Sequence, residues 1–133
     1  GGLQAQLIGD PIGTVVNDTA LIFDTVLNVQ TTDITYDPMT GVFTFAADGN
    51  YLVTWWIATD GAQASTYVEF SLSINGTPFS PAASPIVSGQ LSGSALLSLN
   101  AGDTVTLDNT TGADVTLGNV PTQANVVIIE LNT

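Results

Sequence analysis

The chain has 133 residues, enough for one domain with a single core, and it contains no Lys, Arg, His or Cys. Its formal net charge of −12 excludes nucleic acid partners and disfavours anionic membranes, because both kinds of partner need cationic side chains. The missing cysteines exclude disulfides and thiol chemistry. We therefore expect residues 1–133 to form a single domain, with no nucleic acid binding and no membrane insertion.

The first third of the chain predicts short strands separated by turns. Gly1-Gly2 is either a cloning remnant or the end of a glycine-rich stalk. Residues 3–8 alternate and end at the Gly9-Asp10-Pro11 turn. Strand-forming residues follow at 14–16 and 20–29, broken by Asn17-Asp18, and then at 34–36.

Residues 36–59 predict two strands that meet at a tight turn. The turn is Asp48-Gly49, since glycine tolerates the positive φ that a close reversal needs. The second strand is apolar on both faces, and Trp55 and Trp56 point to opposite sides. In a two-layer monomer one face of each sheet meets water. Either another segment of the same chain or another copy of the chain must therefore cover the second face.

The remaining sequence continues the strand pattern. After a loop at residues 60–63, residues 67–74 alternate, and Asn75-Gly76 predicts a type I′ hairpin turn. Pro78, Pro81 and Pro85 predict an irregular edge. Strands follow at 90–99 and 104–109, then a loop at 110–118 and a buried strand at 125–131. About ten short strands without a helical period predict an all-β, ten-stranded sandwich or jelly roll.

The order of several motifs resembles a known family. These motifs are YDPMTGVF at 36–43, DGNY at 48–51, ING at 74–76 and GSALLSLNAGDTV at 93–105. Together they are similar to the globular heads of the complement 1q type, which share their jelly roll with tumour necrosis factor. The lack of basic residues and the Thr/Ser/Gly-rich loops look most like bacterial members, such as the C-terminal domain of the Bacillus collagen-like exosporium glycoprotein.

The resemblance implies a homotrimer in which the sheet with the first, central and last strands packs about a three-fold axis. The side chains that it places at the trimer interface are Leu52, Thr54, Trp56, Ser92, Ser94, Leu96, Val127, Ile129 and Leu131. Those that it places in the core of each monomer are Phe43, Phe45, Tyr51, Val53, Trp55, Ile57, Leu97, Val126 and Ile128.

The same resemblance implies a structural function. The chain would be the trimerising, surface-displayed head of a collagen-like bacterial spore-surface protein, with a collagen-like stalk on its N-terminal side. Its location would be extracellular, on a cell or spore surface. The alternatives are a trimeric module that binds a host receptor or glycan, and the tip of a phage fibre or adhesin.

Catalysis is not expected, because carboxylates are the only acid–base side chains apart from tyrosine. Most aspartates lie beside Gly or Pro, where their side chains cap turns, as at Asp37, Asp48 and Asp103. We assign no catalytic residue, no metal ligand and no cofactor. Ca²⁺ stays an open alternative, since twelve carboxylates face no cation.

Two further features have plain interpretations. Three matches to the N-glycosylation pattern, at Asn17, Asn75 and Asn109, are explained as turn residues.

The excess of carboxylates should raise the pKa of those carboxyl groups that lack partners. We therefore expect the stability of the protein to increase as the pH falls toward the pI near 4.1.

Overall fold

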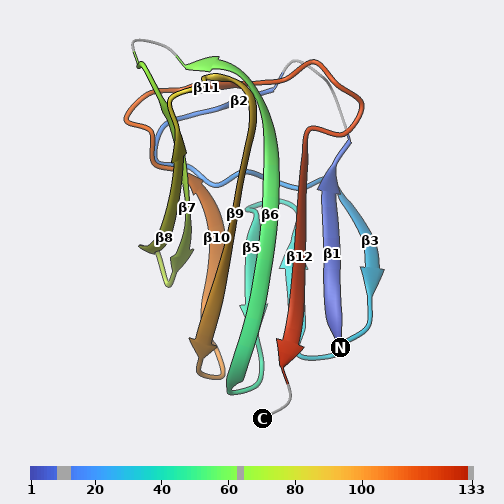
Figure 1. Ribbon diagram of the computed structural model, residues 1–133. Helices are drawn as coiled ribbons and strands as arrows, with labels where there is room; N and C mark the ends of the chain where they lie inside the picture. The colour runs from blue at the N-terminus through green and yellow to red at the C-terminus, as the bar shows by residue number, and fades with distance from the viewer. Residues whose placement is uncertain (9–12, 63–64, 132–133) are drawn as a thin grey trace.

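The structure is a computed structural model that describes residues 1–8, 13–62 and 65–131. The chain forms two antiparallel sheets that face each other as the two layers of a jelly roll (Figure 1). The predicted Gly9-Asp10-Pro11 turn and Gln63 lie outside the described residues. In the part of the chain that is described, no helix has the length and apolar character needed to cross a membrane.

The seven-stranded sheet is built around one long strand, β6 (Gly49–Ala62). Along one edge β6 pairs with β9 (Ser88–Leu99), and along the other with β12 (Ala124–Leu131) and then β11 (Val115–Leu117). The sheet continues from β12 to β1 (Gly2–Leu7) and β3 (Thr25–Val29), and from β11 to β2 (Thr14–Val15). In Figure 1 this sheet lies toward the viewer.

The five-stranded sheet has the order β4 (Ile34–Asp37), β5 (Val42–Phe45), β10 (Thr104–Asn109), β7 (Val68–Ile74) and β8 (Thr77–Ser84). Between β7 and β8, Asn75 has φ 52° and Gly76 has φ 82°, which confirms the predicted type I′ turn. β8 is an edge strand, where proline is tolerated. It forms one continuous strand of eight residues, and its pairing with β7 shifts register once, so the predicted irregular edge is an edge strand with one irregularity.

The predicted tight turn between β5 and β6 was also wrong. The two strands belong to different sheets, and residues 46–48 carry the chain across the sandwich. Gly49 lacks the positive φ that a close reversal would require. Instead, Asp48 Oδ1 accepts a hydrogen bond from Ala101 N (2.6 Å), which ties the crossing to the β9–β10 turn. The strands separate because each buries its aromatic side chains between the layers, and the rings of Phe45 and Tyr51 pack at 4.7 Å.

Other differences from the predicted elements are smaller. The described residues form twelve strands instead of ten, because the proline-containing edge forms β8 and part of a predicted loop forms β11. β11 lies inside the segment predicted as a loop at 110–118. Only Thr25–Val29 of the predicted strand 20–29 is regular, although Ala20 forms one bridge with Asp108.

Gly1 and Gly2 are integral to the sheet. Glu130 N donates to Gly1 O (2.9 Å), and Gln30 N donates to Gly2 O (2.8 Å). An added Cβ would lie 2.0 Å from Gln30 O at Gly1 and 2.5 Å from Ile128 O at Gly2. The neighbouring backbone at Gln30 and Ile128 leaves no room for a Cβ, so both positions require glycine.

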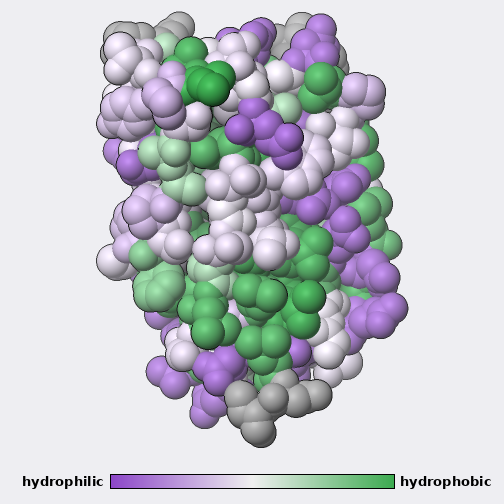
Figure 2. Space-filling model, in the orientation of Figure 1, coloured by the Kyte–Doolittle hydropathy of each residue, from purple (hydrophilic) through white to green (hydrophobic). Residues whose placement is uncertain are grey.

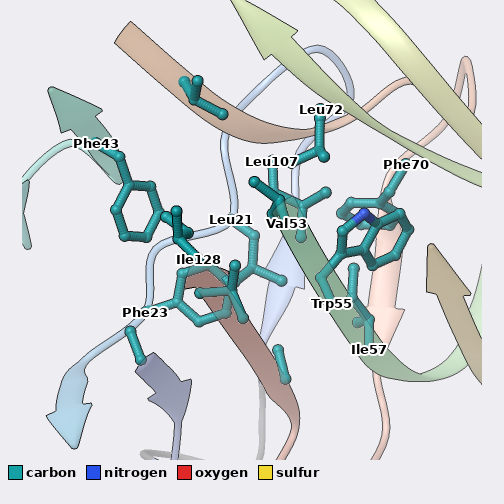
Figure 3. Packing of buried hydrophobic residues seen from close by; sticks show 14 of the residues in the cluster. Leu21, Phe23, Phe43, Val53, Trp55, Ile57, Phe70, Leu72, Leu107 and Ile128 are labelled. Carbon is teal, nitrogen blue, oxygen red and sulfur yellow. The ribbon is translucent and has the colours of Figure 1, made fainter. Parts of the chain in front are cut away.

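Apolar side chains from both sheets form one core (Figure 3). Val53, Trp55 and Ile128 from the seven-stranded sheet meet Phe43, Phe70 and Leu107 from the five-stranded sheet. All nine side chains that the family resemblance placed in the core are at most 3% exposed. Burial of this kind stabilises the fold by about 25 cal/mol per Å² of apolar surface.

Tyr36 fixes the segment that leads into β3. Its hydroxyl accepts a hydrogen bond from Phe23 N (2.6 Å) and donates one to Phe23 O (2.9 Å). Burial raises the pKa of Tyr36 to about 12. The phenol therefore stays protonated, and keeps both hydrogen bonds, far into the alkaline range.

The charge of Asp103 is stabilised by neutral groups. Asn75 Nδ2 donates to one carboxylate oxygen (3.0 Å) and Asn100 N to the other (2.8 Å). These two bonds lower the pKa of Asp103. The expectation of raised pKa values was made for carboxylates that lack partners, and Asp103 is not one of these. Its contribution to stability is present above its ordinary pKa and is lost as the pH falls through the lowered value.

Removal of the Asn75 amide should raise the pKa of Asp103. In Asn75→Gly, the positive φ of the turn is kept while the main hydrogen bond to the carboxylate is lost. Titration of the Asp103 carboxyl carbon by NMR should give a higher pKa than in the wild type. Thr77→Ser serves as the control variant in the same hairpin and should leave the titration of Asp103 unchanged. An unchanged pKa in Asn75→Gly would contradict this account.

Gly93→Ala should destabilise the fold through Trp55. A Cβ at position 93 would lie 2.6 Å from Trp55 Cζ2, so the indole or the strand must shift. We expect the free energy of unfolding in urea to fall by about 1–3 kcal/mol, the usual cost of overpacking. Gly89→Ala, on the same strand, is the matched control: its Cβ would meet only Ile86 Cγ2, at 3.4 Å. Equal effects of the two substitutions at one chain concentration would refute the role of Trp55.

Candidate subunit interface

The outward face of the seven-stranded sheet carries the candidate site. Along β6, the side chains of Tyr51, Val53, Trp55 and Ile57 are buried, whereas those between them are exposed or half-buried. β9 shows the same alternation, and β12 shows it from Val126 onward. Because successive side chains on a strand point to opposite faces, the residues between the buried ones form one continuous outer surface.

Strand pairing arranges this surface in rows that run across the sheet. In the first row Leu96 pairs with Leu52, Leu52 with Ile129, and Ile129 with Gly2. In the second row Ser94, Thr54, Val127 and Gln4 follow one another, and in the third row Ser92, Trp56, Asn125 and Gln6 do so. The first row is apolar and the third is mainly polar.

All nine residues that the resemblance assigned to the trimer interface lie on this face, and none of them is buried within the chain. Among the apolar side chains of these nine residues, the largest exposed fractions are 63% for Leu96, 43% for Ile129 and 38% for Leu131. Figure 2 shows the apolar area as the green region in the lower half of this face, with mostly polar residues above it. We call this area the apolar patch and define it by Leu52, Leu96, Val127, Ile129 and Leu131.

Three polar residues of the face were missed from the sequence. Gln4 Nε2 and Gln6 Nε2 both donate to Asn125 Oδ1, at 2.8 and 3.0 Å. Asn125 is only 9% exposed, so the two glutamines fix its amide in place. The signal was the alternation of glutamine with buried Leu3 and Ala5 in β1, which predicts that the glutamines share one face.

The centre of the face is uncharged. The chain has twelve carboxylates, yet none lies at an outward position of β1 (4 and 6), β6 (52–58, every second residue), β9 (90–98, every second residue) or β12 (125, 127, 129 and 131). Glu130 of β12 alternates with the outward residues and lines the acidic hollow at the end of that strand. Asp60, at the far end of β6, is the nearest acidic residue along that strand. On a chain with a net charge of −12 and no cationic side chain, such a face is distinct from the remaining surface.

An acidic hollow lies at the end of the sandwich where β12 ends. It has a volume of about 280 Å³ and is lined by Asp33, Asp48, Glu130 and Tyr51, among others. Burial, and then the nearby Glu130, Asp33 and Asp48 carboxylates, raise the pKa of Tyr51, whose hydroxyl donates to Ala47 O (2.7 Å). Among the described residues, no group of three or more acidic side chains is placed to hold a metal ion.

Several aspartates and asparagines in the part of the chain that the structure describes form hydrogen bonds that hold turns and loops. Asp37 Oδ1 accepts from Met39 N (2.8 Å), and Asp60 Oδ1 accepts from Ser88 Oγ (3.0 Å). Asn109 is fully buried, and its Nδ2 donates to Val15 O and Ala113 O. It is therefore closed to glycosylation in the folded protein.

Comparisons with known proteins agree with this architecture. The sequence profile of the BclA C-terminal domain family matches residues 4–132. No curated protein matches the sequence significantly.

Solved structures share the fold at low sequence identity. The globular domain of a zebrafish complement 1qA protein is 20% identical, with a TM-score of 0.68 over 98% of this chain and 94% of that one. The Eiger TNF of S. frugiperda is 18% identical, with a TM-score of 0.74 over 98% and 92%. Murine APRIL is 10% identical, with a TM-score of 0.74 over 98% of both chains.

These likenesses confirm the complement 1q and TNF-like jelly roll that the sequence motifs indicated. The family match spans nearly the whole chain. This protein is a member of the BclA C-terminal domain family.

Proposed function

We propose that the chain is the non-catalytic, trimerising head of a collagen-like protein displayed on a bacterial surface, such as the exosporium of a spore. Three copies would pack the outward face of the seven-stranded sheet about a common axis. The family match and the fold support a head of this kind.

The uncharged face is the observation that carries the proposal. Identical chains of charge −12 repel one another, and no basic side chain offsets that repulsion. Contact through the outward face brings no carboxylate of these strands against another, because the outward residues of 52–58, 90–98 and 125–131 carry none and Glu130 lies at an alternate position of β12. The charges then lie on the outside of the assembly, where salt screens them over about 8–10 Å.

The apolar patch supplies the driving force. Leu96, Ile129 and Leu131 are 38–63% exposed in the single chain and lie close together across paired strands. Contiguous apolar surfaces of this kind mark interaction sites on soluble proteins. Every 100 Å² of apolar surface removed from water contributes about 2.5 kcal/mol.

The start of β1 favours a stalk that joins near the same end. Gly2 pairs with Ile129, so the chain enters the sheet beside the apolar patch. Three stalk segments joined to Gly1 would therefore be brought together and aligned by the packed heads. Display on an outer surface also suits a chain without lysine or arginine, because trypsin-like proteases find no cleavage site in it.

One aspartate in the patch should separate the chains. Wild-type protein should show about three times the chain mass of 13.7 kDa by light scattering at micromolar concentration. Ile129→Asp should show the mass of one chain with an unchanged β-sheet circular dichroism spectrum, because a carboxylate cannot be desolvated beside apolar neighbours without a partner.

Ile22→Asp is the matched control for this experiment. Ile22 is 41% exposed, close to the 43% of Ile129, but it lies outside the sheet face. We expect it to keep the trimer mass. A monomeric wild type would refute the proposal, and so would a trimer that survives Ile129→Asp.

A further inference from the structure

We propose that Leu96 of one chain inserts into a hollow on the opposite side of the same sheet face in the next chain. This contact rests on the proposed trimer and specifies which parts of two copies meet. A closed three-fold ring is formed by heterologous contacts, in which two different regions of the surface pair around the axis. The face must therefore contain two complementary halves.

The hollow lies on β1, β3 and β12. It has a volume of about 240 Å³, and its outward lining includes Gly2, Gln4, Asn28, Val127 and Ile129. It exists because the row of outward side chains ends at Gly2, which has none. Gly1 and Gly2 cannot be replaced by a residue with a side chain, because an added Cβ would lie 2.0 Å from Gln30 O at Gly1 and 2.5 Å from Ile128 O at Gly2. The hollow is thus a fixed feature of the sheet.

Leu96 is the projection at the other side of the face. It is 63% exposed, the largest exposed fraction in the apolar patch, and among the described strands its strand β9 pairs with β6 alone. Leu96 and Gly2 are the two ends of one row, Leu96–Leu52–Ile129–Gly2. A rotation about an axis parallel to the strands therefore brings Leu96 to the hollow of the next copy without sliding the sheets along the strands.

The polar rows match under the same rotation. Ser94 shares a row with Gln4, and Ser92 shares a row with Gln6. The glutamines donate through Nε2 to Asn125, so their carboxamide oxygens are oriented to accept hydrogen bonds from serine hydroxyls. The two halves of the face thus pair leucine with an apolar hollow and hydroxyls with amides.

Cysteine cross-linking tests the contact, because the chain has no native cysteine. Leu96→Cys and Asn28→Cys each replace an exposed side chain, so both variants should fold. The double variant, treated with a short bis-maleimide, should give covalent dimers and trimers on denaturing gels. Each single variant should stay uncross-linked, because each contact pairs the Leu96 half of one chain with the Asn28 half of the next, so two cysteines of one kind do not meet.

A dissociation assay gives an independent readout. Leu96→Ala should raise the concentration at which the trimer dissociates by at least about tenfold, as loss of an interface anchor does. Phe79→Ala, which truncates a 54% exposed aromatic side chain on the other sheet, should leave that concentration unchanged.

The outcomes separate this inference from the proposed function. Cross-linking of Leu96→Cys alone would overturn it, because three Leu96 side chains would then meet one another. A trimeric double variant that does not cross-link would also overturn it, while leaving the trimer standing. A monomeric wild-type chain would overturn both.

Discussion

The structure depends on the separation of apolar and charged groups across one sheet. β6, β9 and β12 each alternate buried side chains with outward ones, and the outward ones carry no charge over most of their length. Alternation on one side is enough for a sandwich core. A second apolar surface, free of carboxylates on a chain that has twelve, has no use within one copy and is suited to contact between copies.

The chain stabilises its carboxylates without any cationic side chain. Backbone N–H, hydroxyl and amide groups serve as donors, as for Asp24 from Ile8 N, Asp48 from Ala101 N, Asp114 from Asn17 N and Glu69 from Thr110 Oγ1. Many of these bonds connect segments far apart in sequence. A surface of this kind gains little from ion pairs, so the loops are held by neutral hydrogen bonds and by buried hubs such as Asn109.

In the proposed trimer, both faces of the same strands make contacts. The inward side chains of β6 and β12 hold the two sheets together, and the outward side chains of the same strands would hold the three heads together. Trp55 and Trp56 show this division: the first is 3% exposed in the core, and the second lies half-buried beside Ser92 and Asn125. Destabilising one layer should thus loosen the other, because both depend on the same strand register.

The sequence by itself determined the strand-rich class, the type I′ turn at Asn75-Gly76, the two faces of β6 and the family of the head. These features are local, since side-chain alternation and turn chemistry are set by residues a few positions apart. The tertiary structure decided what depends on distant partners. It placed β5 and β6 in different sheets, paired β11 with β6, buried Asn109 under the loop at 110–114 and joined β1 to β12 so that Gly2 leaves a hollow beside Ile129. Asp48-Gly49 permits a tight turn, but the pairing of β6 with β9 and β12 makes the chain cross the sandwich instead.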